Sequence, residues 1–314
     1  MERRLWSVVA LLAATALAQA TDKRPRITGI DHVAFYTTSP EANQHLYATV
    51  LGLATAAPIE ARQTQRFLIG GRAAGMQWVG YSPAPDAKAT DRMDHIAFLT
   101  DDCAALRSYL AAKGVKVPDS VGNSKDGNRS FRVKDPEGHE IEFVEIRGAG
   151  IQPPVSTMAG SKVVTDAVSR HMIHAGFIVR DRDAEDHFYR DTLGFHIYWH
   201  GGMQPDRTDW VAMQVPDGTD WLEYMLNVDA NPSLRLTGVM NHISLGVADM
   251  KQAQAELEAH GWTPHGDEHS QMGKDGKWQL NLFDPDLTRI ELMEFKPAQK
   301  PCCSDFQGPH PQGP

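Results

Sequence analysis

Four histidines with similar surroundings are the residues best suited to chemistry in this chain. They are His32, His95, His174 and His242, in the runs IDHVAF, MDHIAF, MIHAGF and MNHISL. Each run is short and rich in strand-forming residues, so we expect four β-strands that carry a histidine at the same place. Because imidazole is the commonest metal ligand among side chains, these positions predict a metal site.

Two glutamates lie within apolar runs that end matching parts of the sequence. Glu142 lies in IEFV and Glu291 in IELM, each after an Asp-Pro turn signature. Strand alternation alone could place either glutamate on a solvent-exposed face. If the first and last strands of a segment lie side by side, however, histidine and glutamate point into one concavity. Such ligands suit Zn²⁺, Ni²⁺, Mn²⁺ or Fe²⁺, and the absence of cysteine ligands argues against a closed structural zinc site.

The elements that would position these residues follow an internal repeat. A helical segment and then further strand-like runs follow each histidine, which predicts four βαβββ modules and an α+β fold. The spacing that takes His95 to His242 also takes Gly114 to Gly261, and each glycine fits the end of a helix. Modules one and three correspond in the same way, so the two halves of the chain are related.

This repeat divides the chain into two tandem domains, at residues 27–147 and 170–296, with two modules in each. Residues 148–169, rich in Gly, Pro, Ser and Thr, are expected to link them. Residues 297–314 are rich in Pro and Gly and are expected to form a disordered tail. Whether modules pair within a half or across the halves is left open by the sequence.

The first residues are typical of an export signal. A basic-leaning start precedes an apolar run at 5–17 and the small-x-small tripeptide Ala-Gln-Ala at 18–20. Residues 1–20 are therefore expected to be a signal peptide, with a mature protein that begins near Thr21 and is periplasmic or secreted. The run is too short for a comfortable membrane span, so no stable membrane association is expected after cleavage. An uncleaved membrane anchor is the alternative.

The composition of the chain limits the classes of molecule that it could bind. The net charge is −9 and no basic stripe is present, which disfavours nucleic acid and anionic membranes. A small-molecule substrate and a monomeric chain are expected instead. Cys103 and the neighbours Cys302 and Cys303 do not make a disulfide framework.

Three motifs together resemble the vicinal oxygen chelate superfamily, which includes glyoxalase I, extradiol dioxygenases, methylmalonyl-CoA epimerase and the bleomycin- and fosfomycin-resistance proteins. They are the histidine-bearing first strand, the Tyr-x-x-x-Leu-Gly helix end and the Asp-Pro-x-x-x-x-Ile-Glu terminus. The resemblance covers about residues 27–296. It implies glyoxalase-like domains in which paired modules form a cupped mixed sheet around one divalent ion.

The resemblance also implies ligand sets. In the second half it implies His174, Glu223, His242 and Glu291, the His/Glu/His/Glu set of bacterial-type glyoxalase I. In the first half it implies a second metal site, similar to that of the epimerases, or else a degenerate module pair whose histidines are structural. The residues of that second site would be His32, Gln77, His95 and Glu142.

Three functions remain open. The first is glyoxalase I-like lyase or isomerase chemistry, in which a metal ion stabilises an enediolate and Glu291 or Glu223 moves the proton. Export conflicts with a glutathione-linked substrate, which would be cytoplasmic. The second is an iron(II) extradiol-type dioxygenase that uses His174, His242 and Glu291. Glu223 would fill a position that such a triad leaves open.

The third function is a non-catalytic small-molecule binder, which would use the aromatic residues of the cup. These are Trp199, Trp210, Trp221, Tyr224 and Trp278. Two further histidines, His200 and His269, lie in expected loops near the cup mouth. Either could assist as an acid or base beside the metal ligands.

Overall fold

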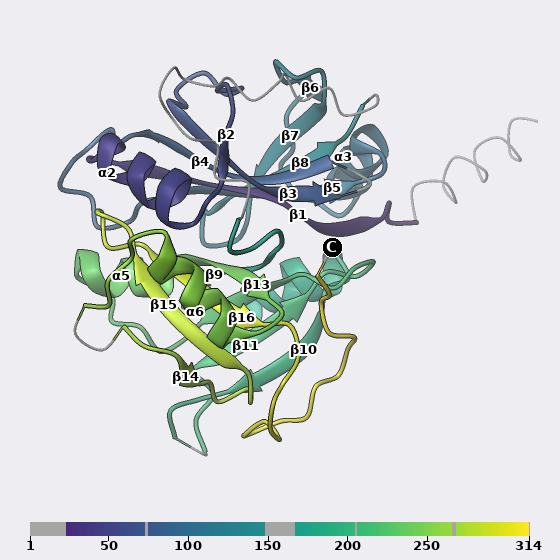
Figure 1. Cartoon of the computed structure of the whole chain (residues 1–314). Helices are drawn as coiled ribbons and strands as arrows, with labels where there is room; N and C mark the ends of the chain where they lie inside the picture. Colours follow the sequence, from purple (N-terminus) through teal and green to yellow (C-terminus); the bar gives the residue numbers. More distant parts are fainter. Residues whose placement is uncertain (1–22, 73–74, 148–166, 205, 266–267, 314) are drawn as a thin grey trace, which may run out of the picture.

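A computed structural model describes residues 23–313 except 73–74, 148–166, 205 and 266–267 (Figure 1). The expected signal peptide and most of the expected linker lie outside the described residues. The chain forms two domains that pack one on the other, and each contains one eight-stranded mixed sheet with few helices. This is the predicted α+β fold.

The first domain contains two βαβββ modules. The elements of the first module are β1 (Ile27–Thr37), α2 (Pro40–Gln44) with the π-helical turn η1 (His45–Val50), β2 (Ala54–Thr55), β3 (Gln65–Arg72) and β4 (Gly75–Pro83). Those of the second are β5 (Met93–Thr100), α3 (Cys103–Ala112), β6 (Gly122–Asn123), β7 (Arg129–Lys134) and β8 (Glu140–Glu145).

The second domain repeats this order. The elements of its first module are β9 (Met172–Ile178), α4 (Arg182–Asp186) with the π-helical turn η2 (His187–Thr192), β10 (His196–Gly201), β11 (Trp210–Gln214) and β12 (Trp221–Met225). After α5 (Leu234–Met240) come those of the last module, which are β13 (His242–Val247), α6 (Met250–Ala259), β14 (Gln271–Met272), β15 (Trp278–Phe283) and β16 (Arg289–Glu294).

Sheet order places the histidine strands at the centre. The orders are β2-β3-β4-β1-β5-β8-β7-β6 and β10-β11-β12-β9-β13-β16-β15-β14. The two central strands are antiparallel, and the last strand of each module runs parallel to the first strand of the same module. Modules therefore pair within each half, which the sequence left open.

Local signals explain the longer helices. Asp102 begins α3 by accepting a hydrogen bond from the backbone N–H of Ala105, and Asp249 begins α6 in the same way. Gly114 and Gly261 follow these helices with φ of +84° and +92°, a left-handed conformation that glycine adopts without steric cost. The helix ends predicted at both glycines are confirmed.

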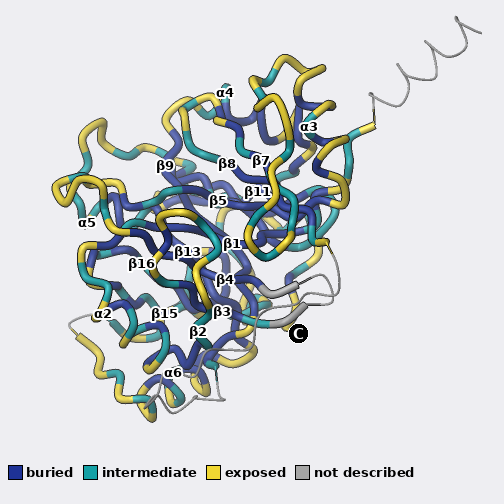
Figure 2. Tube along the Cα trace, turned by 90° about the horizontal axis from the view of Figure 1, so that it is seen from above, coloured by how far each residue is buried: buried dark blue, intermediate teal, exposed yellow. Residues whose placement is uncertain are grey.

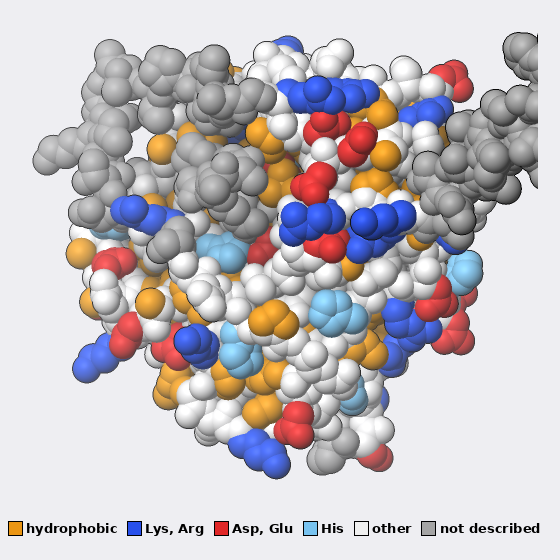
Figure 3. Space-filling model, turned by 90° about the vertical axis from the view of Figure 1, so that its right-hand side faces the viewer, with side chains coloured by type: hydrophobic (Ala, Val, Ile, Leu, Met, Phe, Trp, Pro, Cys, Tyr) orange, Lys and Arg blue, Asp and Glu red, His pale blue; other side chains and the backbone are white. Residues whose placement is uncertain are grey.

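The strands supply most of the interior. Most buried apolar side chains of both domains form one continuous core, a smaller cluster in the second domain includes Tyr198, Trp199 and Trp221, and the central strands are the most enclosed part of the chain (Figure 2). On the face in Figure 3, cationic and anionic side chains are interspersed. None of the helices in the described residues is long and apolar enough to cross a membrane.

The C-terminal segment is ordered, and the expectation of a disordered tail at 297–314 is wrong for residues 297–313. The segment runs along the second domain beside β10 (Figure 1). The backbone N–H of Cys302 donates to the carbonyl of Lys274 at 2.8 Å, and the carbonyl of Gln312 lies 2.7 Å from Nδ1 of His171. Cys302 and Cys303 form a disulfide with each other. Specific backbone contacts therefore order this segment, although its composition is typical of disorder.

Candidate metal centres and the adjoining pocket

The second domain brings His174, Glu223, His242 and Glu291 together, one from each of the four middle strands. Nε2 of His174 lies 3.1 Å from Nε2 of His242 and 3.2 Å from Oε2 of Glu291. Oε2 of Glu223 lies 3.4 Å from Nε2 of His242 and 3.8 Å from Nε2 of His174. Two nitrogens and two carboxylate oxygens thus converge, and this donor set fits a divalent transition-metal ion with coordination positions to spare.

A glycine makes room for one of these ligands. A Cβ atom at Gly176 would lie 2.0 Å from Cε1 of His242, far inside van der Waals contact. Gly176 pairs with His242 across the two central strands. The glycine in the run MIHAGF is therefore required for the His242 ring to reach the site, although no motif or spacing in the sequence marks it.

The electrostatic environment of this site favours the protonation states in which side chains bind metal. Burial and the Arg289 guanidinium lower the pKa of His242 to about 4, which keeps the imidazole neutral. Burial by itself would raise the pKa of Glu291, but Arg289 and the two imidazoles outweigh it and lower that pKa. Nη2 of Arg289 lies 2.7 Å from Nε2 of His242 and 4.0 Å from Oε2 of Glu223. Neutral imidazoles and ionised carboxylates are the forms that bind metal.

The first domain gathers a related cluster of His32, His95 and Glu142. Nε2 of His32 lies 2.8 Å from Nε2 of His95, which lies 3.3 Å from Oε2 of Glu142. Nδ1 of each ring contacts the carboxylate of the preceding residue, Asp31 at 2.6 Å and Asp94 at 3.0 Å. Carboxylates on the second ring nitrogen orient metal-binding histidines in this way.

Gln77 does not join this cluster, so its assignment to a second metal site is wrong. Its Nε2 donates to the carbonyls of Ile30 and Met172 at 3.0 and 2.9 Å, and its Oε1 accepts from the backbone N–H of Met172 at 2.8 Å. The amide is fully used in joining the two domains. Strand register aims the side chain at that interface rather than at the two imidazoles.

Glu60 takes the place expected for Gln77. It lies in the loop between β2 and β3, and its Oε1 atom is 3.2 Å from Nε2 of His95 and 3.5 Å from Nε2 of His32. Nη2 of Arg132 lies 3.0 Å from Glu60 and 2.8 Å from Glu142. No repeat or strand pattern marks Glu60 in the sequence, so only the path of the loop reveals it.

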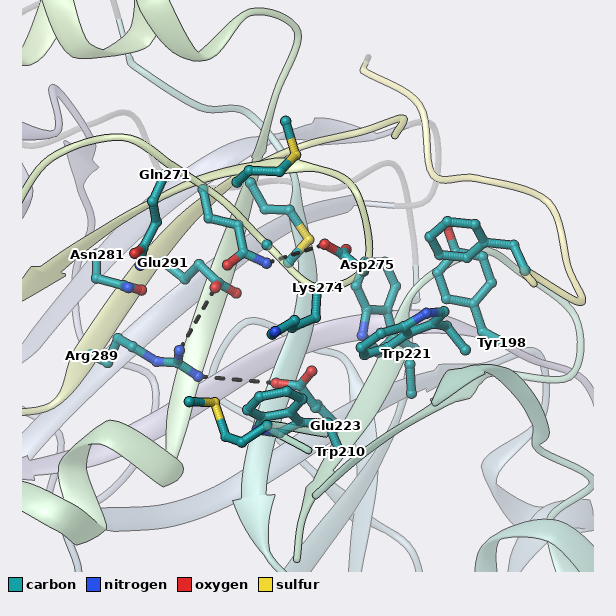
Figure 4. A pocket seen from close by; sticks show the side chains of 18 residues that line it. Tyr198, Trp210, Trp221, Glu223, Gln271, Lys274, Asp275, Asn281, Arg289 and Glu291 are labelled. Atoms are coloured by element: carbon teal, nitrogen blue, oxygen red, sulfur yellow. Dashed lines mark hydrogen bonds and ion pairs between the residues drawn. The ribbon is translucent and has the colours of Figure 1, made fainter. Parts of the chain in front are cut away.

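A pocket opens over the second-domain cluster (Figure 4). Its volume is about 380 Å³. Glu223, Glu291, Arg289 and Asn281 lie together on one side of it. The aromatic residues that line it are Tyr198, Trp199, Trp210, Trp221 and Phe306.

Several expected residues lie elsewhere. Neither His200 nor His269 is among the residues that line the pocket. The backbone N–H of His200 donates to Oγ of Ser304 in the C-terminal segment. Tyr224 is buried in the core and Trp278 is partly exposed, and neither lines the pocket.

Comparison with known proteins decides the family. The model of the Glyoxalase/Bleomycin resistance protein/Dioxygenase superfamily matches residues 29–143 and 171–292. The chain belongs to this superfamily. The resemblance inferred from the three motifs is thereby confirmed, together with the tandem glyoxalase-like architecture. A search of curated protein sequences finds no match for the chain.

Solved structures with the same fold include dioxygenases and a glyoxalase. The 2,3-dioxygenase LapB from Pseudomonas sp. KL28 is 16% identical, with 92% of this chain and 96% of that chain covered and a TM-score of 0.62. The Mn(II)-bound glyoxalase from Novosphingobium aromaticivorans is 19% identical, with 86% and 83% covered and a TM-score of 0.59. An extradiol ring-cleaving dioxygenase from B. fuscum is 16% identical, with 91% and 75% covered and a TM-score of 0.61. At these identities the likeness shows the fold alone.

Proposed function

We propose that this protein is an exported, divalent-metal-dependent lyase or isomerase of the glyoxalase type, with its reaction centre in the second domain. The observation that carries the proposal is the second carboxylate. Oε2 of Glu223 stands within 3.8 Å of both Nε2 atoms, and Glu223 lines the pocket. The pattern of residues 1–20 supports export.

The residues of the site have separate roles in this reaction. When bound by His174, His242 and Glu291, a divalent ion supplies Lewis-acid polarisation of adjacent substrate oxygens. Glu223 is the carboxylate best placed to move a proton between neighbouring carbons, because its side chain is 14% exposed and that of Glu291 only 3%. Arg289, within 4.0 Å of both carboxylates, offsets negative charge that develops on the substrate.

We also propose a second metal ion in the first domain. Four ligand atoms from His32, Glu60, His95 and Glu142 lie within 4.8 Å of one another. Three of the residues are buried and Glu60 is half-buried. This set supports metal binding with a loop glutamate in the place first expected for Gln77.

A specific observation favours an iron(II) ring-cleaving dioxygenase as a second candidate. The ligand atoms of His174, His242 and Glu291 form a mutually close group, and Glu223 is not part of it. That arrangement is the two-histidine, one-carboxylate triad of non-haem iron oxygenases. The loop histidines expected to serve ring cleavage as acid or base, His200 and His269, do not line the pocket, whereas the proton-transfer carboxylate of the lyase, Glu223, does. The lyase is therefore preferred.

One set of measurements separates these functions. Protein purified without chelator is analysed for metal, then loaded with Ni²⁺, Zn²⁺, Mn²⁺ or anaerobic Fe²⁺. We expect oxygen-independent isomerisation of a hemithioacetal, and we expect Glu223→Gln to remove it. Catechol-dependent oxygen uptake that survives Glu223→Gln would instead establish the dioxygenase. A metal-loaded protein with neither activity would be a binding protein.

The matched control is Glu258→Gln, because Glu258 is an exposed carboxylate on α6. It should leave metal content and isomerisation unchanged. A protein that stays metal-free after all four incubations would contradict every metal-dependent function.

A further inference from the structure

The C-terminal segment forms part of the pocket wall. Phe306 lines the pocket, and it is the only residue of 297–313 that does so. Its neighbour Gln307 donates its backbone N–H to the carbonyl of Tyr198 at 2.9 Å. Nε1 of Trp199 donates to the carbonyl of Cys302 at 3.2 Å. The segment is thus bound to two aromatic residues of the pocket through backbone atoms.

A buried lysine joins the segment to the second domain. Lys277 has no exposed surface, and its Nζ lies 4.6 Å from the ring centroid of Trp221, 5.2 Å from that of Tyr198 and 5.3 Å from that of Phe306. Cation–π attraction in a water-excluded site is stronger than on a surface. Lys277 therefore holds three rings from three parts of the chain around one point.

The rings also contact one another. The Tyr198 ring centroid lies 4.8 Å from that of Phe306 and 5.1 Å from that of Trp221. Nδ1 of His310 contacts the Tyr198 hydroxyl at 2.5 Å, so a second residue of the segment fixes the same ring. The wall that results is made of flat aromatic rings, and Lys274 and Asp275 also line the pocket.

Polar groups lie opposite this wall. The pocket combines the aromatic residues with Glu223, Glu291 and Arg289 beside the proposed metal ion (Figure 4). A ligand that fills it must present oxygen atoms to the metal centre and an apolar, flat group to the rings. Stacked and edge-to-face ring contacts stabilise an aromatic group more than an alkyl group of equal area.

We propose that the C-terminal segment completes the substrate site and that Phe306 selects ligands with an aryl group next to two adjacent oxygen atoms. This inference deepens the proposed function and rests on its metal ion. The enzyme would then act on aryl-substituted hydroxy- or oxo-compounds in preference to small aliphatic ones.

Binding of mandelate and lactate to the metal-loaded full chain tests the proposal. Both are 2-hydroxy acids with adjacent hydroxyl and carboxylate oxygens, and they differ in a phenyl against a methyl group. Calorimetry should give mandelate the lower Kd. Phe306→Ala should weaken mandelate binding by roughly 3- to 10-fold, which corresponds to one ring contact, and leave lactate unchanged.

Two further variants make the result decisive. Phe306→Leu keeps apolar bulk at this position and should weaken mandelate binding by a similar factor while leaving lactate binding unchanged, so a misfolded alanine variant leaves a test in place. Asp305→Ala alters an exposed neighbour outside the pocket lining and should change neither Kd. Equal binding of the two acids, no mandelate binding, or an equal loss of both in the Phe306 variants would overturn the inference. Because binding needs no turnover, a chain that prefers mandelate yet isomerises nothing would disprove only the proposed reaction.

Discussion

Glu185 gives the most quantitative prediction for this protein. It lies on α4 in the second domain with no exposed surface, and its Oε1 accepts from the backbone N–H of Glu137 in the first domain at 3.0 Å. Oε2 has no hydrogen-bond partner within the described residues. Burial and the nearby Asp135 carboxylate raise the pKa of Glu185 to about 9. At neutral pH the folded protein must therefore hold this side chain protonated.

The sign of the pH dependence follows from this. An unfolded glutamate ionises near pH 4.5, so between that pH and about 9 the folded chain binds a proton that the unfolded chain has lost. Stability should fall by up to about 1.4 kcal/mol for each pH unit as pH rises through this window. Glu185→Gln retains an oxygen acceptor and a donor but cannot ionise, so it should not show this loss.

Urea unfolding at pH 6, 7 and 8 in the presence of chelator checks the magnitude. The free energy of unfolding of Glu185→Gln minus that of the wild type should grow by about 3 kcal/mol across the range. The corresponding residue of the first domain is Asn43, which is also fully buried, so a neutral amide already occupies this position in one half. Glu258→Gln on the surface should give a difference that does not change with pH. A constant difference for Glu185→Gln as well would refute the reasoning.

Three other variants test the site geometry. Gln77→Leu should lower the free energy of unfolding by about 2–3 kcal/mol, because it leaves interface backbone groups of Ile30 and Met172 without partners, while metal content stays unchanged; lost metal with unchanged stability would contradict this. Glu60→Ala should remove one of two metal equivalents in elemental analysis and spare hemithioacetal isomerisation, and two retained equivalents would exclude Glu60 as a ligand. Gly176→Ala should weaken metal binding at the second-domain site by at least roughly tenfold in a chelator competition, because its Cβ would displace the His242 ring; unchanged affinity would show that the ring can shift without loss.

The sequence by itself determined the elements and most of the second-domain cluster. A period of two along each strand puts alternate side chains on one face, and the repeated runs mark which strands are first and last in a module. Those two facts mark His174, His242 and Glu291 as candidate ligands, whereas Glu223 was implied by the resemblance to the superfamily, and the pairing of first and last strands then places it beside them. The superfamily was recognisable for the same reason, since its motifs lie on regular elements.

Only the tertiary structure determined the roles of residues that lie on loops or at an interface. Glu60 reaches the first cluster through an irregular loop, and no periodicity constrains such a path. Gln77 was assigned to the wrong site because the register of β4, which the sequence does not fix, turns its side chain to the interface between the domains, where its amide is used. Phe306 lies in a Pro- and Gly-rich segment whose order comes from contacts with Tyr198 and Lys277, both distant in sequence. The composition of this segment shows that it offers little apolar surface. It carries no information about the surface of the second domain on which the segment packs.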